Sequence, residues 1–140
     1  MKIVHVSLCS YPYISTWGYQ ENHLIEAHHR AGHDVTEITT AYIPPNYQEH
    51  IAFDESLKKR VYIDEYGTKI IRLHYKYKIP LFIQYRIRIF EDFYQTLEEE
   101  QPDVLFIHDL QFMDLFTVKK YAKKHPECLI KGDIHVSEIN

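Results

Sequence analysis

Short apolar runs alternate along the chain with stretches in which apolar and small residues recur at helical spacing. The first run, residues 2–8, is nearly continuous, as is typical of a strand buried at the centre of a parallel sheet. Helical spacing follows over residues 19–31, and Gly32 provides a stop for this helix. Residues 35–39 then alternate as a second strand does. This order predicts the first βαβ unit of a parallel sheet.

The same alternation continues through the rest of the chain. It predicts further strands at residues 60–63, 69–73, 103–108 and 128–134, helices at residues 80–102 and 112–124, and a surface excursion over residues 41–60. The helix between Pro80 and Pro102 is expected to be long and unbroken, because its apolar residues keep the helical period. The whole pattern predicts an α/β fold, a Rossmann-like doubly wound parallel sheet with helices on both faces.

The sequence contains no internal repeat, low-complexity tract or linker, so residues 1–140 are expected to form a single α/β domain. It stops just after a predicted strand, where a complete domain of this kind would normally return another helix. We therefore expect the domain to belong to a larger protein.

Composition and charge narrow the functional classes. Hydrophobic residues make up 45% of the chain and charged residues 26%, as in ordinary globular proteins. The net charge of -4 argues against nucleic acid as the main partner. Only Met1 precedes the first strand, and no apolar run approaches the length of a membrane span. A cytoplasmic location is expected, with Cys9 and Cys128 as reduced thiols.

Polar side chains follow three predicted strands at their carboxyl ends, where parallel sheets place functional groups. They are Ser10 after the first strand, His108 and Asp109 after a middle strand, and His135 after the last strand. The first loop carries neither a G-x-G-x-x-G nor a G-x-x-x-x-G-K-[ST] motif, so a nucleotide phosphate is not its expected ligand. Its Tyr, Trp, Ser, Thr and Gln side chains suit a hydroxyl-rich or mixed polar ligand better. An open alternative is that His108 and Asp109 only cap the following helix.

Other histidines and carboxylates have structural explanations. The first helix and its end carry His23, His28, His29 and His33. No metal site is expected there, because His28 and His29 point roughly 100° apart and no cysteine or carboxylate completes a set; solvated histidines are the better account. Glu91 and Glu99 would lie two turns apart on the predicted long helix, as a pair suited to acid–base chemistry. Their acidic neighbours favour a solvated face instead.

Residues 69–90 are basic and aromatic. They include six Lys or Arg residues and no acidic residue, with tyrosines and a phenylalanine interleaved. Such a surface can bind anionic lipid head groups. The residues that we assign to this membrane or anionic patch are Lys76, Lys78, Arg86 and Arg88. Simple charge balance against the neighbouring acidic stretch is the open alternative.

Five segments, taken in order, resemble the amino-terminal domain of glycosyltransferase family 4 enzymes, which are two-domain proteins of the GT-B fold. They are the strand KIVHVS, the loop SYPYISTWGYQE, the block RAGHDVTEIT, the stretch PDVLFIHDLQF and the strand KGDIH. The resemblance covers nearly the whole chain, residues 2–135.

The resemblance implies an activity. Enzymes of this family transfer a sugar from a nucleotide-sugar donor, with retention of anomeric configuration and without a metal or other cofactor. The acceptor, a sugar, lipid or polysaccharide, binds mainly to the amino-terminal domain. The nucleotide binds mainly to a carboxy-terminal domain that lies outside this sequence, so the fragment alone is not expected to catalyse the transfer.

The resemblance also implies site residues. His135 would be the catalytic residue beside the transferring sugar. The residues implied in binding acceptor or donor sugar are Trp17, Gly18, Tyr19, Glu21, His108 and Asp109. Trp17 and Asp109 stand where the family usually carries glycine, and both side chains would narrow the acceptor pocket. We expect Trp17, His108 and His135 to face one another across one lip of the sheet.

The sequence pattern also bears on two other functional classes. A stand-alone, non-catalytic Rossmann-like domain that binds or regulates a ligand fits the same pattern, because folds of this class carry many functions. A dinucleotide-dependent enzyme is disfavoured, because the glycine fingerprint is missing and no acidic residue ends the second strand.

Overall fold

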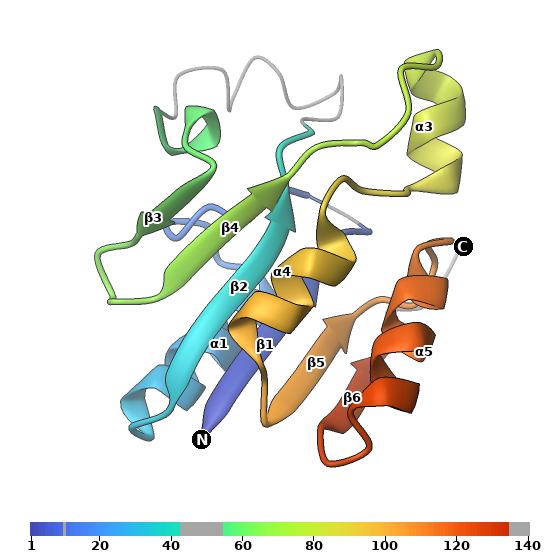
Figure 1. The fold of residues 1–140 in the computed structure, drawn as a ribbon. Helices are drawn as coiled ribbons and strands as arrows, with labels where there is room; N and C mark the ends of the chain where they lie inside the picture. The colour runs from blue at the N-terminus through green and yellow to red at the C-terminus, as the bar shows by residue number, and fades with distance from the viewer. Residues whose placement is uncertain (10, 43–54, 135–140) are drawn as a thin grey trace, which may run out of the picture.

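Within residues 1–9, 11–42 and 55–134, which the computed structural model describes, the chain forms one six-stranded sheet (Figure 1). The strands are β1 (Lys2–Ser7), β2 (Asp34–Thr40), β3 (Val61–Ile63), β4 (Lys69–Leu73), β5 (Val104–His108) and β6 (Leu129–Asp133). Their order is β3-β4-β2-β1-β5-β6, and β3 is antiparallel to β4 whereas the other pairs are parallel. The predicted α/β class is thus confirmed, and the strand order is consistent with a Rossmann-like fold.

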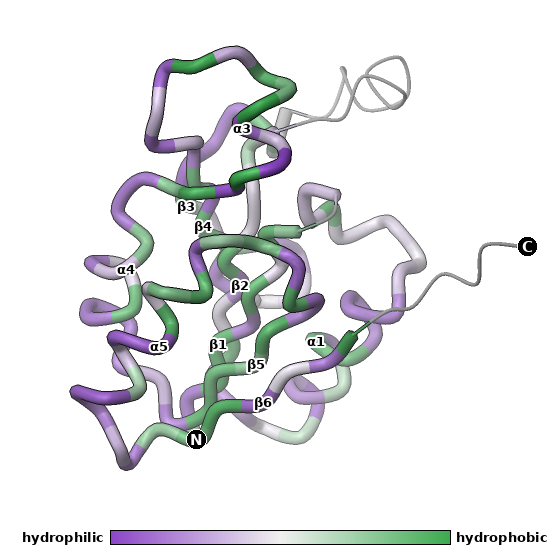
Figure 2. The backbone as a smooth tube through the Cα atoms, turned by 90° about the vertical axis from the view of Figure 1, so that its right-hand side faces the viewer, coloured by the Kyte–Doolittle hydropathy of each residue, from purple (hydrophilic) through white to green (hydrophobic). Residues whose placement is uncertain are grey.

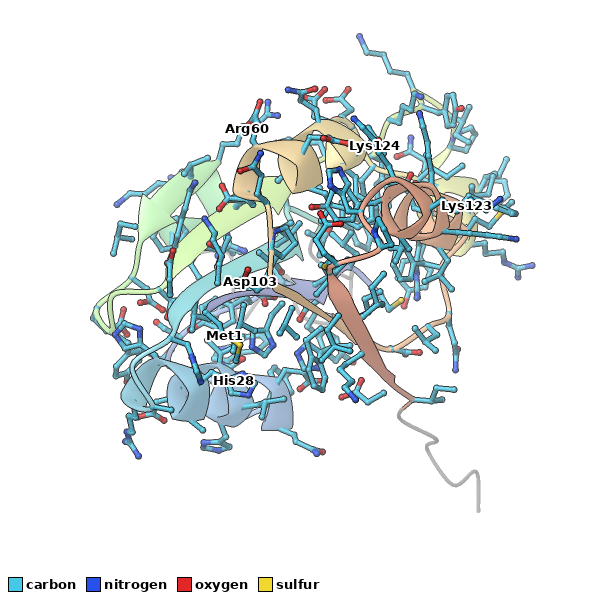
Figure 3. The ribbon with its side chains drawn as sticks, turned by 60° about the horizontal axis from the view of Figure 1, so that its bottom comes forward. Met1, His28, Arg60, Asp103, Lys123 and Lys124 are labelled. Atoms are coloured by element: carbon cyan, nitrogen blue, oxygen red, sulfur yellow. The ribbon has the colours of Figure 1, made fainter. Side chains whose placement is uncertain are left out.

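The described helices are α1 (Gln20–Arg30), the 3-10 helix η2 (Glu55–Lys58), α3 (Leu81–Ile87), α4 (Phe93–Glu100) and α5 (Leu115–Lys124). Figure 1 shows α4 and α5 in front of the sheet, and the view from below in Figure 3 shows α1 on the opposite side. None of the helices in the described ranges is long and apolar enough to cross a membrane.

Side chains alternate across β1, so this strand contributes to two different layers. Val4 and Val6 are fully buried in the main apolar core, together with side chains of α4 and α5. Hydrophobic residues follow β1 through the centre of the molecule, whereas the outer turns of α4 and α5 are hydrophilic (Figure 2). The intervening residues His5 and Ser7 are also buried, and His5 hydrogen-bonds to His28 of α1. The face of β1 with Val4 and Val6 therefore joins the main apolar core, whereas the other face combines the apolar Ile3 with the polar His5 and Ser7.

The single long helix expected over residues 80–102 is wrong. α3 ends at Ile87, and Arg88 adopts a left-handed backbone conformation with φ of 51°. α4 begins only at Phe93. Glu91 therefore lies outside α4 and does not share a helix face with Glu99, although both side chains are exposed, as expected.

Tertiary contacts explain why the helical period fails between α3 and α4. Phe90 is buried in the core, and its backbone N–H donates to Asp114 Oδ2 at 2.9 Å. The backbone N–H of Glu91 donates to the carbonyl of His74 at 2.8 Å. These hydrogen bonds run across the fold rather than along a helix, so they satisfy the backbone groups that the helical pattern would have paired locally.

Glu100, at the end of α4, joins the amino ends of three strands. Its carboxylate forms an ion pair with Lys2 of β1 at 2.7 Å, another with Lys69 of β4, and accepts a hydrogen bond from Thr36 of β2 at 3.2 Å. Burial alone would raise the pKa of this carboxyl, but the hydrogen bonds from the two lysines outweigh burial and lower the pKa. Glu100 thus links α4 to the sheet at the edge opposite the carboxyl ends of the strands.

Replacing this carboxylate should destabilise the fold. We expect Glu100→Ala to reduce the free energy of unfolding by about 1–3 kcal/mol, because Lys2, Lys69 and Thr36 lose a buried acceptor. The neighbouring variant Glu99→Ala removes an exposed carboxylate and should change stability by less than about 0.5 kcal/mol. Urea unfolding followed by circular dichroism measures both. Equal stability of the two variants would show that the Glu100 cluster contributes nothing.

Candidate functional site

The strand order reverses at β1, because β2 and β4 lie on one side of it and β5 and β6 on the other. Ligands of open parallel sheets bind at the carboxyl ends of the strands beside such a reversal. A pocket of about 150 Å³ lies there. It is lined by Ser7, Tyr11, Pro12, Tyr13, Tyr19, Glu21, Asn22 and Asp109. Pockets for drug-sized ligands measure roughly 300–1,000 Å³, so this one suits a single small ring or group.

Tyr13 fixes the first loop, which forms one wall of the pocket. Its backbone N–H donates to Thr39 Oγ1 at 2.8 Å, and its hydroxyl donates to Asp64 Oδ2 at 2.9 Å. Its carbonyl accepts a hydrogen bond of 2.7 Å from the guanidinium of Arg72, which is fully buried. Burial and the Asp64 carboxylate both raise the pKa of Tyr13, so its hydroxyl stays protonated and remains a donor. The loop is therefore held at both the backbone and the side chain.

Asn22 holds the second half of this loop. Its side-chain amide donates to the carbonyls of Ile14 at 2.8 Å and Trp17 at 2.6 Å. The loop also presents a row of aromatic rings, with Tyr11 and Tyr19 stacked at 5.7 Å between centroids and Trp17 edge-on to Tyr19 at 5.3 Å. Flat apolar faces are thereby brought next to the polar groups of the pocket.

The residues implied by the resemblance separate into several groups. Tyr19, Glu21 and Asp109 line the pocket at the carboxyl ends of β1 and β5. Trp17 and Gly18 line a neighbouring pocket of about 210 Å³ between the loop, α1 and the turn before β4. The structure therefore places Trp17 beside the expected pocket rather than in its wall.

The two histidines of the expected site are placed differently. His108 is only 3% exposed and lies beneath the pocket rather than in its wall. One of its ring nitrogens hydrogen-bonds to His5 Nδ1 at 2.8 Å and the other to Asp133 Oδ2 at 3.2 Å. His135 lies outside the described residues, as does Ser10.

Asp109 has an unusual backbone conformation. Its φ of 63° falls in the left-handed region, which asparagine, aspartate and glycine tolerate best. Its N–H donates to Asp133 Oδ1 at 3.1 Å, and its carboxylate accepts a hydrogen bond of 3.2 Å from the backbone of Gln111. Asp109 does not cap α5, which begins at Leu115. The capping alternative is therefore wrong for this residue, and its side chain lines the pocket instead.

Ser7 of the pocket wall and Glu37 add buried polar groups on this face of the sheet. Glu37 of β2 is completely buried, and neither of its carboxyl oxygens has a hydrogen-bond partner within the described residues. Burial raises the pKa of this carboxyl to about 8, although the nearby Ser7 hydroxyl and, more weakly, the Arg72 guanidinium favour the charged form. At neutral pH the Glu37 carboxyl is therefore mostly protonated and neutral.

Sequence reasoning missed His5, Glu37 and Asp133. His5 and Glu37 stand opposite each other in the parallel pair of β1 and β2, on the same face of the sheet. A histidine in the middle of an apolar strand and a glutamate in a β-branched strand were the available signals. Burial and the charges of neighbouring histidines lower the pKa of His5 to about 2, so its ring is neutral.

Metal-ligand geometry and thiol acidity are two further properties of the described residues that bear on chemistry at this site. Within the described residues, no group of three or more His, Cys, Asp or Glu side chains is arranged to hold a metal ion. Cys9 is buried, and burial together with the Asp109 carboxylate raises the pKa of its thiol to about 11. A thiolate nucleophile is therefore scarce at neutral pH.

Comparison with known proteins identifies no relative. No protein-family model, curated protein or solved structure matches this chain.

The buried acid and the buried base predict how stability depends on pH. The Glu37 carboxyl ionises near 4.5 in an unfolded chain and near 8 in the folded protein, so stability present below pH 4.5 is lost as the pH rises. The His5 ring binds a proton near 6.5 when unfolded and near 2 when folded, so stability present above pH 6.5 is lost as the pH falls. Between pH 4.5 and 6.5 the loss of stability from Glu37 and the gain of stability from His5 cancel as the pH rises. Urea unfolding across this range should therefore show maximal stability from about pH 4.5 to 6.5.

The variant Glu37→Gln separates the two contributions. It should abolish the loss of stability between pH 6.5 and 8, which for Glu37 has an upper limit of about 2 kcal/mol. Below pH 4.5 the dependence of stability on pH should be unchanged. Glu99→Gln, at an exposed site, should follow the parent at every pH. A parent whose stability is constant from pH 6.5 to 8 would contradict the assignment.

Proposed function

We propose that this chain is the acceptor-binding, amino-terminal half of a retaining glycosyltransferase, with the doubly wound arrangement of a GT-B domain. The observation that carries the proposal is the small pocket at the strand-order reversal, where tyrosine rings and two carboxylates meet. The resemblance of five ordered sequence segments to glycosyltransferase family 4 supports it independently.

The chemistry of the pocket matches a sugar ring. A sugar has C–H faces that pack on aromatic rings and hydroxyl groups that donate to carboxylates. Tyr11 and Tyr19 offer stacked rings, and Glu21 and Asp109 offer acceptors in the same pocket. Ser7 adds a buried hydroxyl to the pocket wall, beside the Glu37 carboxyl.

The same pocket is a poor site for a nucleotide diphosphate. Glu21 and Asp109 would both repel phosphate charge. We therefore assign the donor nucleotide to a second domain and the acceptor to this one. Closure of two such domains excludes water from the reacting sugar. In this arrangement His135 is the proposed catalytic residue beside the transferring sugar.

A second function, binding without catalysis, is supported by the same pocket. A non-catalytic domain that binds a small hydroxylated ligand by itself would use the same residues, and the two functions differ in whether a donor domain is needed.

A basic and apolar surface around α3 supports peripheral membrane contact as part of the proposal. α3 has no buried residue, and Leu81 and Phe82 are 59% and 71% exposed. Figure 1 shows α3 set apart from the layered body of the fold. Lys76, Lys78 and Arg86 are exposed around it. Arg88 is half-buried, with its guanidinium over the Tyr85 ring at 4.6 Å and bonded to the Gln111 carbonyl at 3.3 Å.

Sugar binding can be tested on the chain itself. We expect glucose, mannose, galactose or N-acetylglucosamine, added at millimolar concentration to 15N-labelled protein, to shift amide signals of Tyr11, Tyr19, Glu21 and Asp109 in NMR spectra. The variant Glu21→Gln should weaken this binding about tenfold, because a charged acceptor for a hydroxyl is lost. Glu99→Gln, on the opposite face of the sheet, should bind as the parent does.

Two results would contradict the proposal. If none of the four sugars changed the amide signals, the pocket would not be a sugar site. Micromolar binding of a nucleotide sugar to this chain, abolished by Glu21→Gln, would place the donor rather than the acceptor here.

Membrane contact has its own test. We expect the chain to sediment with vesicles that contain phosphatidylglycerol in phosphatidylcholine, less so as salt is raised, and not with phosphatidylcholine alone. Phe82→Ser and Arg86→Gln should each reduce binding several-fold. Ile63→Ser replaces a residue of similar exposure, 62%, on β3 at the far edge of the sheet and should have no effect. Binding insensitive to salt, or lost equally in all three variants, would refute this surface.

A further inference from the structure

A continuous row of hydrogen bonds crosses the α1 face of the sheet. It runs from Asp133 Oδ2 to His108 Nδ1 at 3.2 Å and from His108 Nε2 to His5 Nδ1 at 2.8 Å. It continues from His5 Nε2 to His28 Nδ1 at 3.0 Å. The row therefore joins β6, β5, β1 and α1. Each of the two inner rings is engaged through both of its nitrogens.

The rings are placed so that a proton can pass between them. The planes of His5 and His108 lie within 6° of each other and those of His5 and His28 within 35°, and the facing nitrogens of both pairs are within hydrogen-bond distance. His5 is 0% exposed and His108 3% exposed. His28 is half-buried and lies between α1 and the sheet (Figure 3). The inner rings are thus shielded from water, whereas the outer ring is accessible.

Charged and titratable side chains lie next to the row of histidines. Glu37 of β2 stands opposite His5 in the sheet, and His33 contacts the ring of His28. Asp133 closes the row on β6. Burial and His33 both lower the pKa of His28. The outer ring therefore gives up a proton readily at neutral pH.

We propose that His28, His5 and His108 form a proton relay between solvent at α1 and the Asp133 carboxylate at the carboxyl edge of the sheet. This inference goes beyond the proposed function and does not depend on it. Sugar binding does not require such a row, and none of the four residues of the row lines the pocket.

The transfer is balanced at each atom. In the starting state all three rings carry their proton on Nδ1 and Asp133 is ionised. A proton from water binds Nε2 of His28, and the N–H on its Nδ1 breaks as Nε2 of His5 gains a proton. The Nδ1 proton of His5 then passes to Nε2 of His108, and the Nδ1 proton of His108 passes to Asp133. All three rings end neutral with the proton on Nε2, and the carboxyl is protonated.

The far end of the row lies next to the candidate pocket. The second oxygen of Asp133 accepts the backbone N–H of Asp109, whose side chain is in the pocket wall. The relay therefore supplies or removes a proton at the edge of the ligand site without opening the buried face to water.

Ring tautomers give the first test. Long-range 1H–15N NMR spectra of the chain at pH 8 should show His5, His28 and His108 all protonated on Nδ1. His5→Phe should release only His28 from this tautomer, because the Nδ1 proton of His108 still has Asp133 as acceptor. The proposal would be overturned if some of the three rings were protonated on Nδ1 and others on Nε2.

Proton exchange gives the second test and does not rely on substitution of a buried ring. His28→Gln lets the new amide donate to His5 but cannot pass a proton on. Exchange of the ring N–H protons of His5 and His108 with water should slow by about tenfold or more, while backbone amides of β1 exchange as before. His23→Gln, an exposed site on the same helix, is the matched control. Equal ring-exchange rates in the two variants would overturn the relay and leave the row a structural feature.

Discussion

The pairing of β1 with β2 on one side and β5 on the other is the constraint on which the rest of the structure depends. Both pairings are parallel and in fixed register, so the carboxyl ends of the strands reach the same edge. A shift of one residue in β1 would exchange His5 and Ser7 with Val4 and Val6 and reverse its apolar and polar faces. The pocket, the buried carboxyl and the row of histidines all follow from this register.

The two faces of the sheet bury different kinds of side chain. The α4 and α5 side is a conventional apolar core. The α1 side buries a guanidinium, a neutral carboxyl and two imidazoles, which can be stable only because most of them are hydrogen-bonded or uncharged. Arg72 meets carbonyl oxygens and a tyrosine hydroxyl rather than a carboxylate partner. This concentration of polar groups at one face is typical of a functional region rather than of a core built for stability alone.

Periodicity predicted the strands and most helices because burial imposes it directly. All six predicted strands exist, and Gly32 does follow α1 in the left-handed conformation. The pattern failed at Arg88 and Phe90, where cross-fold hydrogen bonds decide the backbone and leave no mark on local periodicity. Asp109 could be predicted at this edge because strand ends converge, whereas Tyr19 and Glu21 were implied by the family resemblance. The partnership of His5 with His28 could not, since it depends on how α1 rotates against the sheet.

The left-handed backbone at Asp109 limits what evolution can place at the pocket wall. Most side chains would cost roughly 1–2 kcal/mol at this φ, whereas glycine, asparagine and aspartate are admitted readily. Of these three, only aspartate supplies a negative charge. Position 109 can therefore carry no side chain with glycine, a neutral amide with asparagine, or a carboxylate with aspartate. Diversification of ligand preference must come mainly from the aromatic loop, in which none of the described residues has a positive φ.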